Sequence, residues 1–167
     1  MLPPASASKT IEDYARNIFI ADVVSQVRTV KRLDVIWDIY YPSTTWTLAE
    51  LSSKGWYQSE LFELLAKHVE SLAIEGKQLI ITFKEDVISA TAIHKEGLAT
   101  CNHEEGDTRV LLHAPHAAKL WYHRVMVRIA DTDIVVLCIF YITKWNFQEL
   151  WIAFGVGKHV IKVYYHI

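Results

Sequence analysis

Short apolar runs rich in β-branched residues alternate along this chain with stretches of helical spacing, and this alternation limits the fold more than any other feature. Residues 33–39 (LDVIWDI) and 77–83 (KQLIITF) have the composition of buried strands. Between them, residues 59–76 place apolar side chains on one helical face, begin at a serine and end at a glycine. This order predicts a right-handed βαβ unit with parallel strands. We therefore expect an α/β fold, a Rossmann-like three-layer sandwich with a mostly parallel central sheet.

The segments around this unit fit the same class. Thr10 is a predicted N-cap, with Asp13 in the place of the capping-box acid, and residues 10–27 follow with an apolar stripe at helical spacing. Residues 87–93 have a weaker strand pattern. We expect a helix before the βαβ unit and a third strand after it.

Two strand-like segments near the end of the chain, residues 149–154 and 160–166, flank the glycine-containing sequence GVGK at 155–158. Glycines between two apolar runs predict a β-hairpin. GVGK also resembles part of a phosphate-binding loop, but that loop needs the longer GxxxxGK[ST] pattern leading into a helix. The hairpin is therefore the preferred interpretation.

Size and charge exclude some classes of protein. The chain has 167 residues, 51% of them hydrophobic, which is enough for one domain with a substantial core. We expect a frayed, disordered leader at residues 1–9 and a single domain over residues 10–167. The formal net charge of −2 argues against a surface that coats nucleic acid, although a local basic path can still exist.

The cysteines and the apolar runs indicate the compartment. Cys101 and Cys138 are the two cysteines, and no secretory signal precedes them. This usage is typical of a reducing environment, so we expect an intracellular protein, nuclear or cytoplasmic. The longest apolar run, residues 134–142, is far shorter than the roughly 20 residues that a membrane helix needs. We expect no membrane span.

Two compact acidic groups stand out within residues 103–140. Glu105 and Asp107 come at the start of a predicted helix, and Asp131 and Asp133 come just after the extended apolar run at 125–129. In an open parallel sheet, ligands collect outside the carboxyl ends of the strands. Helices that run back along the sheet begin at the same rim, so the two acidic groups can lie close together.

Carboxylates gathered at one point repel each other unless a cation neutralises them or they bind protons. The carboxylate oxygens favour Mg²⁺ or Mn²⁺. Asp38, near the carboxyl end of the strand at 33–39, is a third contributor. Two other interpretations stay open: Asp38 caps the following turn, and Glu104, Glu105 and Asp107 complement a helix dipole, each worth about 0.3–1 kcal/mol.

A zinc site is a competing interpretation. Its ligands would be Cys101, His103, His113 and His116, and histidines three residues apart share a helical face. Pro115, however, is expected to break that helix. The C-x-H spacing is also not typical of a zinc knuckle, so we prefer the carboxylate site.

Three motifs, occurring in this order along the chain, resemble those of a known family. They are HEEGDTRVLLHA at 103–114, VMVRIADTDIVVL at 125–137 and ELWIAFGVGK at 149–158. Together they resemble the core of PIN-like nuclease domains of the flap-endonuclease type. They are most similar to a group of uncharacterised invertebrate proteins with EEADTR, DTDVVVL and LWIAFGTGK. Upstream, RLDVIWDIYYP at 32–42 resembles the strand that ends in FDxY in the same group. The resemblance covers roughly residues 10–167.

This resemblance implies a metal-dependent phosphodiesterase that cuts DNA or RNA, with carboxylates holding one or two Mg²⁺ ions. Such ions activate water and stabilise the attacking and leaving oxygens of an in-line displacement. The residues that match the family's metal-binding and catalytic carboxylates are Asp38, Glu105, Asp107, Asp131 and Asp133, with Glu104 as a weaker candidate.

The chain also departs from the family pattern. No strand ending in an aspartate precedes residue 33, no GCDT-like segment follows the last strand, and the basic arm is reduced to residues 42–58. Trp121 stands where the family has a turn glycine, and Gly106 replaces an alanine. We therefore expect a partial PIN-like domain, shortened at both ends, that lacks some carboxylates and phosphate-binding surface. The alternative is a non-catalytic remnant or a protein-interaction domain.

Overall fold

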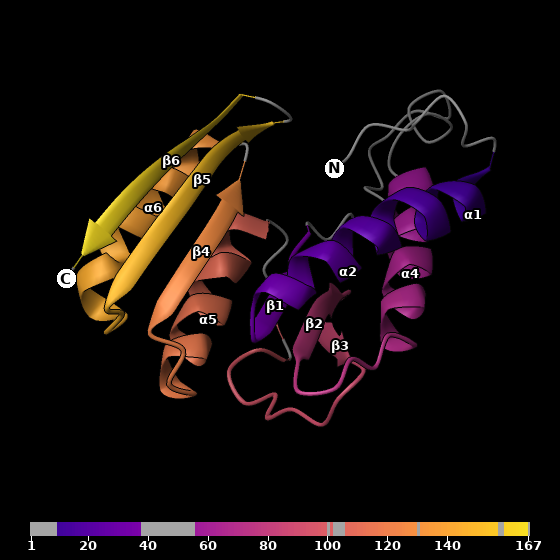
Figure 1. The fold of residues 1–167 in the computed structure, drawn as a ribbon, viewed down its shortest axis with the longest axis horizontal. Coiled ribbons are helices and arrows are strands. Elements are labelled where there is room, and N and C mark those ends of the chain that lie inside the picture. Colours follow the sequence, from indigo (N-terminus) through magenta and orange to yellow (C-terminus); the bar gives the residue numbers. More distant parts are fainter. Residues whose placement is uncertain are drawn as a thin grey trace, which may run out of the picture. The chain divides into compact units, whose positions relative to one another are not determined.

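A computed structural model of the chain describes residues 10–37, 56–99, 101, 106–129, 131–156 and 159–166 (Figure 1). The chain divides into two compact units, Met1–Glu104 and Glu105–Ile167. Each unit contains helices and a three-stranded sheet with one parallel and one antiparallel strand pair. The fold is therefore of the mixed α/β class, as predicted. The three-layer sandwich and the single domain over residues 10–167 stay predictions.

The first helix begins where the sequence predicts, because its first turn is capped reciprocally. Thr10 Oγ1 accepts a hydrogen bond from the Asp13 N–H at 3.0 Å, and the Asp13 carboxylate accepts one from the Thr10 N–H at 3.1 Å. Two backbone donors that lack helical partners are satisfied in this way. The helix then continues through α1 (Ile11–Tyr14), a π-helical turn (Ala15–Phe19) and α2 (Ile20–Thr29).

The predicted βαβ arrangement is present in unit 1. Its elements are β1 (Arg32–Val35), α4 (Trp56–Glu70), β2 (Gln78–Phe83) and β3 (Asp86–Ser89). β1 and β2 are parallel, with Leu33 opposite Leu79, and β3 is antiparallel to β2. The helix begins before Ser59, so the prediction of Ser59 as its N-cap is wrong. Serine is tolerated inside a helix at a cost of a few tenths of a kcal/mol, and its presence alone does not fix a helix start.

β1 is shorter than the strand predicted over residues 33–39, and Trp37 explains where it stops. The Trp37 N–H donates a hydrogen bond to Thr82 Oγ1 at 3.0 Å, and the indole Nε1–H donates to the Thr82 carbonyl at 2.8 Å. After β1, a side-chain hydroxyl therefore accepts the hydrogen bond from the backbone N–H, in place of a carbonyl of the neighbouring strand. The indole also stacks on Phe62 and contacts Phe19, with ring centroids 4.7 and 5.4 Å away. β1 itself is half-buried rather than fully buried.

The core of unit 1 lies between its helices and one face of its sheet. Its buried side chains are Tyr14, Ala15, Phe19, Val23, Leu65, Ala66, Val69, Leu79 and Ile81. Successive strand residues point to opposite faces, so Ile80 and Val87 belong to a second buried cluster together with Leu98. The apolar helical face predicted around Leu65 and Val69 is confirmed.

A charged contact joins α1 to α4 beside this core. The Glu12 carboxylate accepts a hydrogen bond from Arg16 Nε at 2.7 Å and lies 3.1 Å from His68 Nε2. The other ring nitrogen of His68 lies 2.9 Å from the Leu64 carbonyl oxygen. Both ring nitrogens therefore face acceptors, which the imidazole satisfies together when it is protonated. The hydrogen bonds from Arg16 and His68 hold the pKa of Glu12 below its ordinary value.

Unit 2 repeats the strand, helix, strand order. Its elements are α5 (Gly106–Lys119), β4 (Arg124–Ile129), α6 (Thr132–Tyr141), a 3₁₀ turn (Ile142–Lys144), β5 (Glu149–Val156) and β6 (His159–His166). β4 and β5 are parallel, and β5 and β6 form the predicted antiparallel hairpin. Figure 1 shows α5 and α6 on the same side of this sheet. Within the described ranges, no helix is long and apolar enough to cross a membrane.

Pro115 lies inside α5, where the sequence predicts a break. The helix continues to Lys119, with Val110, Ala114 and Ala117 buried. Proline leaves the carbonyl four residues earlier without a helical donor, and an interior proline costs about 3 kcal/mol. The predicted break is wrong because burial of these apolar side chains offsets that local cost.

α5 ends in a turn that holds a tryptophan in left-handed backbone. Trp121 has a φ of +66° and its side chain is 81% exposed. The Tyr122 N–H donates to the Ala117 carbonyl at 3.1 Å, and the Trp121 N–H donates to the Ala118 carbonyl at 3.0 Å. These two bonds form a Schellman motif, whose left-handed residue is usually glycine. Trp121 therefore occupies a position that favours glycine for steric reasons.

We expect Trp121→Gly to raise the free energy of unfolding by about 1 kcal/mol, because glycine adopts this backbone without strain. Trp121→Ala is the matched control, since it also removes the indole and its edge contact with His123 but keeps a Cβ at positive φ. Urea unfolding of the three proteins would measure the difference. Equal stability of the glycine and alanine variants would contradict the prediction.

We expect Glu12→Gln to lower the free energy of unfolding at neutral pH and to have little effect in acid. A carboxyl group whose pKa is lowered by folding stabilises the folded state above its unfolded pKa, and this contribution is lost as the pH falls through the folded pKa. Urea unfolding at neutral pH and at roughly pH 3 would test this. Glu60→Gln, at an exposed position of α4, is the control. The same destabilisation by Glu12→Gln at both pH values would argue against the contact.

Candidate functional site

Asp131 and Asp133 lie just beyond the carboxyl end of β4, as the sequence predicts. Asp131 is the N-cap of α6, with φ −98° and ψ 138°, and its Oδ1 accepts a hydrogen bond from the Asp133 N–H at 2.9 Å. Both residues are exposed. The backbone turns at Asp131 from extended to helical, so the two residues no longer alternate across a strand. Two carboxylates are thereby presented at one end of the sheet of unit 2.

Sequence reasoning did not identify the helix that Asp131 begins. The run IVVLCIFY at 134–141 is apolar at every position and therefore has no helical period. A signal was present nonetheless, because an aspartate directly before an apolar run is typical of an N-cap. The DTD motif, which resembles a metal-binding motif, instead led to the prediction of a metal site.

The other predicted carboxylates are less fully described. Asp38, Glu104 and Glu105 lie outside the described residues. Asp107 is the second residue of α5, and its side chain is outside the described part of the chain. The position of Asp107 in the first helical turn fits both earlier interpretations, a metal ligand and a carboxylate that complements the helix dipole. The five-carboxylate site therefore stays a prediction.

No three metal-ligating side chains come together within the described parts of the chain. Of the competing zinc ligands, Cys101, His113 and His116 are buried, and His103 lies outside the described residues. The zinc interpretation gains no support from this arrangement. Of the predicted carboxylates, Asp131 and Asp133 are the ones whose side chains the structure describes.

A shallow depression of about 480 Å³ lies beside β3 in unit 1. Its lining is mainly apolar and includes Ile93 and the acidic residues Glu70 and Asp86. Burial acts to raise the pKa of Asp86, but hydrogen bonds from the Val87 N–H and from Lys95 outweigh it and lower the pKa below its ordinary value. Lys95 Nζ lies 3.1 Å from the Asp86 carboxylate. This carboxylate already has a cationic partner, so the depression does not have the chemistry of a metal site.

Cys138 is the buried thiol on the inner side of α6. Its side chain is fully buried, and burial raises its pKa to about 11. A thiol with this pKa is protonated at neutral pH, whereas nucleophilic cysteines act as thiolates. Cys138 therefore contributes to packing, and covalent catalysis by this cysteine is not expected.

Comparison with known proteins gives no relative: no family model matches the sequence, and neither a curated protein nor a solved structure matches it significantly. The assignment of function therefore depends on the residues described above.

We expect Asp131→Ala to lower the free energy of unfolding by about 1 kcal/mol, because it removes the N-cap of α6. Asp131→Asn should stay within a few tenths of a kcal/mol of the parent, since asparagine caps a helix as well as aspartate does. Thermal and urea unfolding would measure both variants. If the alanine and asparagine variants were equally stable, the capping role of Asp131 would be wrong.

Proposed function

We propose that the chain is a PIN-like, nuclease-type domain that uses Mg²⁺ or Mn²⁺ to hydrolyse phosphodiester bonds in DNA or RNA. The observation that carries the proposal is the exposed pair Asp131 and Asp133 directly after the parallel strand β4. Carboxyl ends of parallel strands are where ligands bind in open α/β sheets. Exposed carboxylate pairs suit hard divalent cations.

The order of elements within each unit supports an α/β domain of this kind. The parallel pair β1 and β2 is joined through α4, and the parallel pair β4 and β5 is joined through α6. Crossovers between parallel strands are right-handed. The three-layer sandwich with a mostly parallel central sheet is the fold that we propose.

Asp131 follows β4 by two positions, at the carboxyl end of a parallel strand, where α/β proteins bind their ligands. Asp107 lies in the first turn of α5 in the same unit. The family resemblance matches five carboxylates to metal ligands, and the proposed ligands are therefore Asp38, Glu105, Asp107, Asp131 and Asp133.

The capping role of Asp131 is compatible with metal binding. A carboxylate offers about four lone-pair positions on two oxygens, and the Asp133 N–H uses one of them. The capping bond also fixes the orientation of the carboxylate before an ion binds. Bound Mg²⁺ or Mn²⁺ would activate a water molecule and stabilise the leaving oxygen of the nucleic-acid backbone.

A second function, a non-catalytic remnant or interaction domain of the same fold, is favoured by one observation. Capping alone accounts for Asp131, because its oxygen satisfies a backbone donor at the start of α6. In that case the exposed carboxylates are solvated and bind no ion tightly.

Calorimetric titration with Mg²⁺ and with Mn²⁺ distinguishes the two functions. We expect the parent chain to bind and Asp131→Asn/Asp133→Asn to lose binding by at least about tenfold, while its unfolding curve stays close to that of the parent. Cleavage of single-stranded, hairpin and flap substrates by the parent, and not by the double variant, would then test catalysis. Absence of metal binding by the folded parent would overturn the nuclease proposal and leave the non-catalytic domain.

A further inference from the structure

The outer side of α6 exposes three large apolar side chains. Val136 is 64% exposed, Phe140 is 64% exposed and Ile139 is 41% exposed. A surface helix normally presents polar residues to water and apolar residues to the core. α6 is apolar on both sides, since its inner side carries the fully buried Cys138. The outer side therefore has the composition of a contact surface.

The exposed residues form one stripe along the helix. Residues three and four positions apart share a helical face, which aligns Asp133, Val136, Phe140 and Thr143 and places Ile139 beside them. All five are exposed. The stripe is polar at both ends and apolar in the middle, so its centre can pack against another apolar surface.

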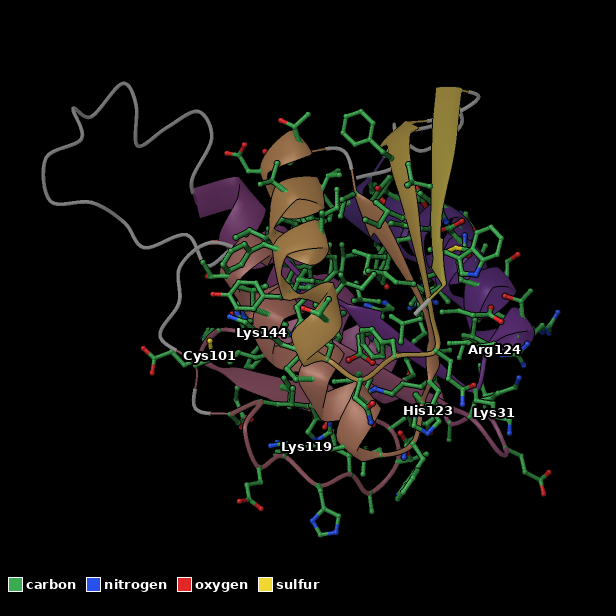
Figure 2. The ribbon with its side chains drawn as sticks, turned by 90° about the vertical axis from the view of Figure 1, so that its left-hand side faces the viewer. Lys31, Cys101, Lys119, His123, Arg124 and Lys144 are labelled. Carbon is green, nitrogen blue, oxygen red and sulfur yellow. The ribbon has the colours of Figure 1, made fainter. Side chains whose placement is uncertain are left out.

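Opposite charges mark the two ends of this stripe. Asp131 and Asp133 are exposed at the N-terminal end of α6. Lys144 follows at the other end, with its ammonium 4.9 Å from the Phe140 ring centroid and 4.8 Å from that of Tyr141 (Figure 2). These cation–π contacts hold the charge of Lys144 against the stripe. The stripe therefore runs from negative through apolar to positive.

We propose that this stripe binds the same stripe of a second copy of the chain, with the two α6 helices antiparallel. A two-fold symmetric contact needs a surface that is complementary to itself. Antiparallel alignment about the middle of the stripe brings Val136 of one copy to Phe140 of the other. It also brings Asp133 of each copy to the Thr143 and Lys144 end of the other. Both the apolar and the charged positions are matched by this one arrangement.

The size of the stripe sets the strength of the contact. A single pair of short helices buries less than the roughly 1,200 Å² that marks the lower end of stable interfaces. The dimer is therefore weak and depends on protein concentration. It does not rest on the proposed nuclease function, because neither metal binding nor cleavage enters the argument.

Sedimentation equilibrium over a range of concentrations tests the dimer directly. We expect the parent to associate and Val136→Ser/Phe140→Ser to be monomeric, with the dissociation constant raised by at least about tenfold. Met126→Ser is the matched control, because Met126 is 51% exposed but lies on β4. A parent that stays monomeric at all concentrations, or a control that dissociates as the double serine variant does, would overturn the proposal.

A charge exchange separates this arrangement from non-specific association. Asp133→Lys and Lys144→Glu each put like charges together at both ends of the contact, so each should weaken the dimer by about tenfold or more. The double variant restores opposite charges, because each altered residue meets the other one on the second copy. We expect its dissociation constant to return to near the parental value, with circular dichroism confirming that all variants are folded. Failure of the double variant to recover association would exclude the antiparallel contact.

Discussion

Both units depend on a pair of parallel strands, and this pairing dictates the elements around it. Parallel strands cannot be joined by a tight turn, so the chain must return along the sheet before the second strand begins. α4 makes this return in unit 1 and α6 makes it in unit 2. In each unit an antiparallel strand, β3 or β6, then pairs with the second parallel strand. β1 and β4 are thereby left as sheet edges, and the acidic residues follow their carboxyl ends.

Features with local causes were predicted from the sequence. The capping box of Thr10 and Asp13 needs only two residues three positions apart, and the β5–β6 hairpin needs glycines between two apolar runs. Features that depend on residues far apart in the chain were not predicted. β1 stops early because Trp37 bonds to Thr82, which is 45 positions away in the chain. Pro115 stays in its helix because Val110, Ala114 and Ala117 are buried; their helical spacing is visible in the sequence, but the extent of their burial is not.

The candidate site divides in the same way. Asp131 was placed correctly because an extended apolar run ends just before it, which is a local signal. Its bond to the Asp133 N–H was not foreseen, because the apolar run after it lacks a helical period. The exposed stripe of α6 could not be predicted from composition for the same reason. Which side of a uniformly apolar helix faces water is decided by the elements it packs on, and in α6 Cys138 is fully buried.

The bond at the start of α6 has a consequence for how such a protein changes over time. A single amide in place of the Asp131 carboxylate keeps the acceptor that the helix needs and discards the negative charge that a cation needs. Quality control in a cell responds to unfolded chains, and it would not detect this exchange. Folding therefore exerts no pressure to preserve the negative charge at this position. Under the proposed function, a lineage can therefore lose metal binding in one step and keep the fold available for a different role.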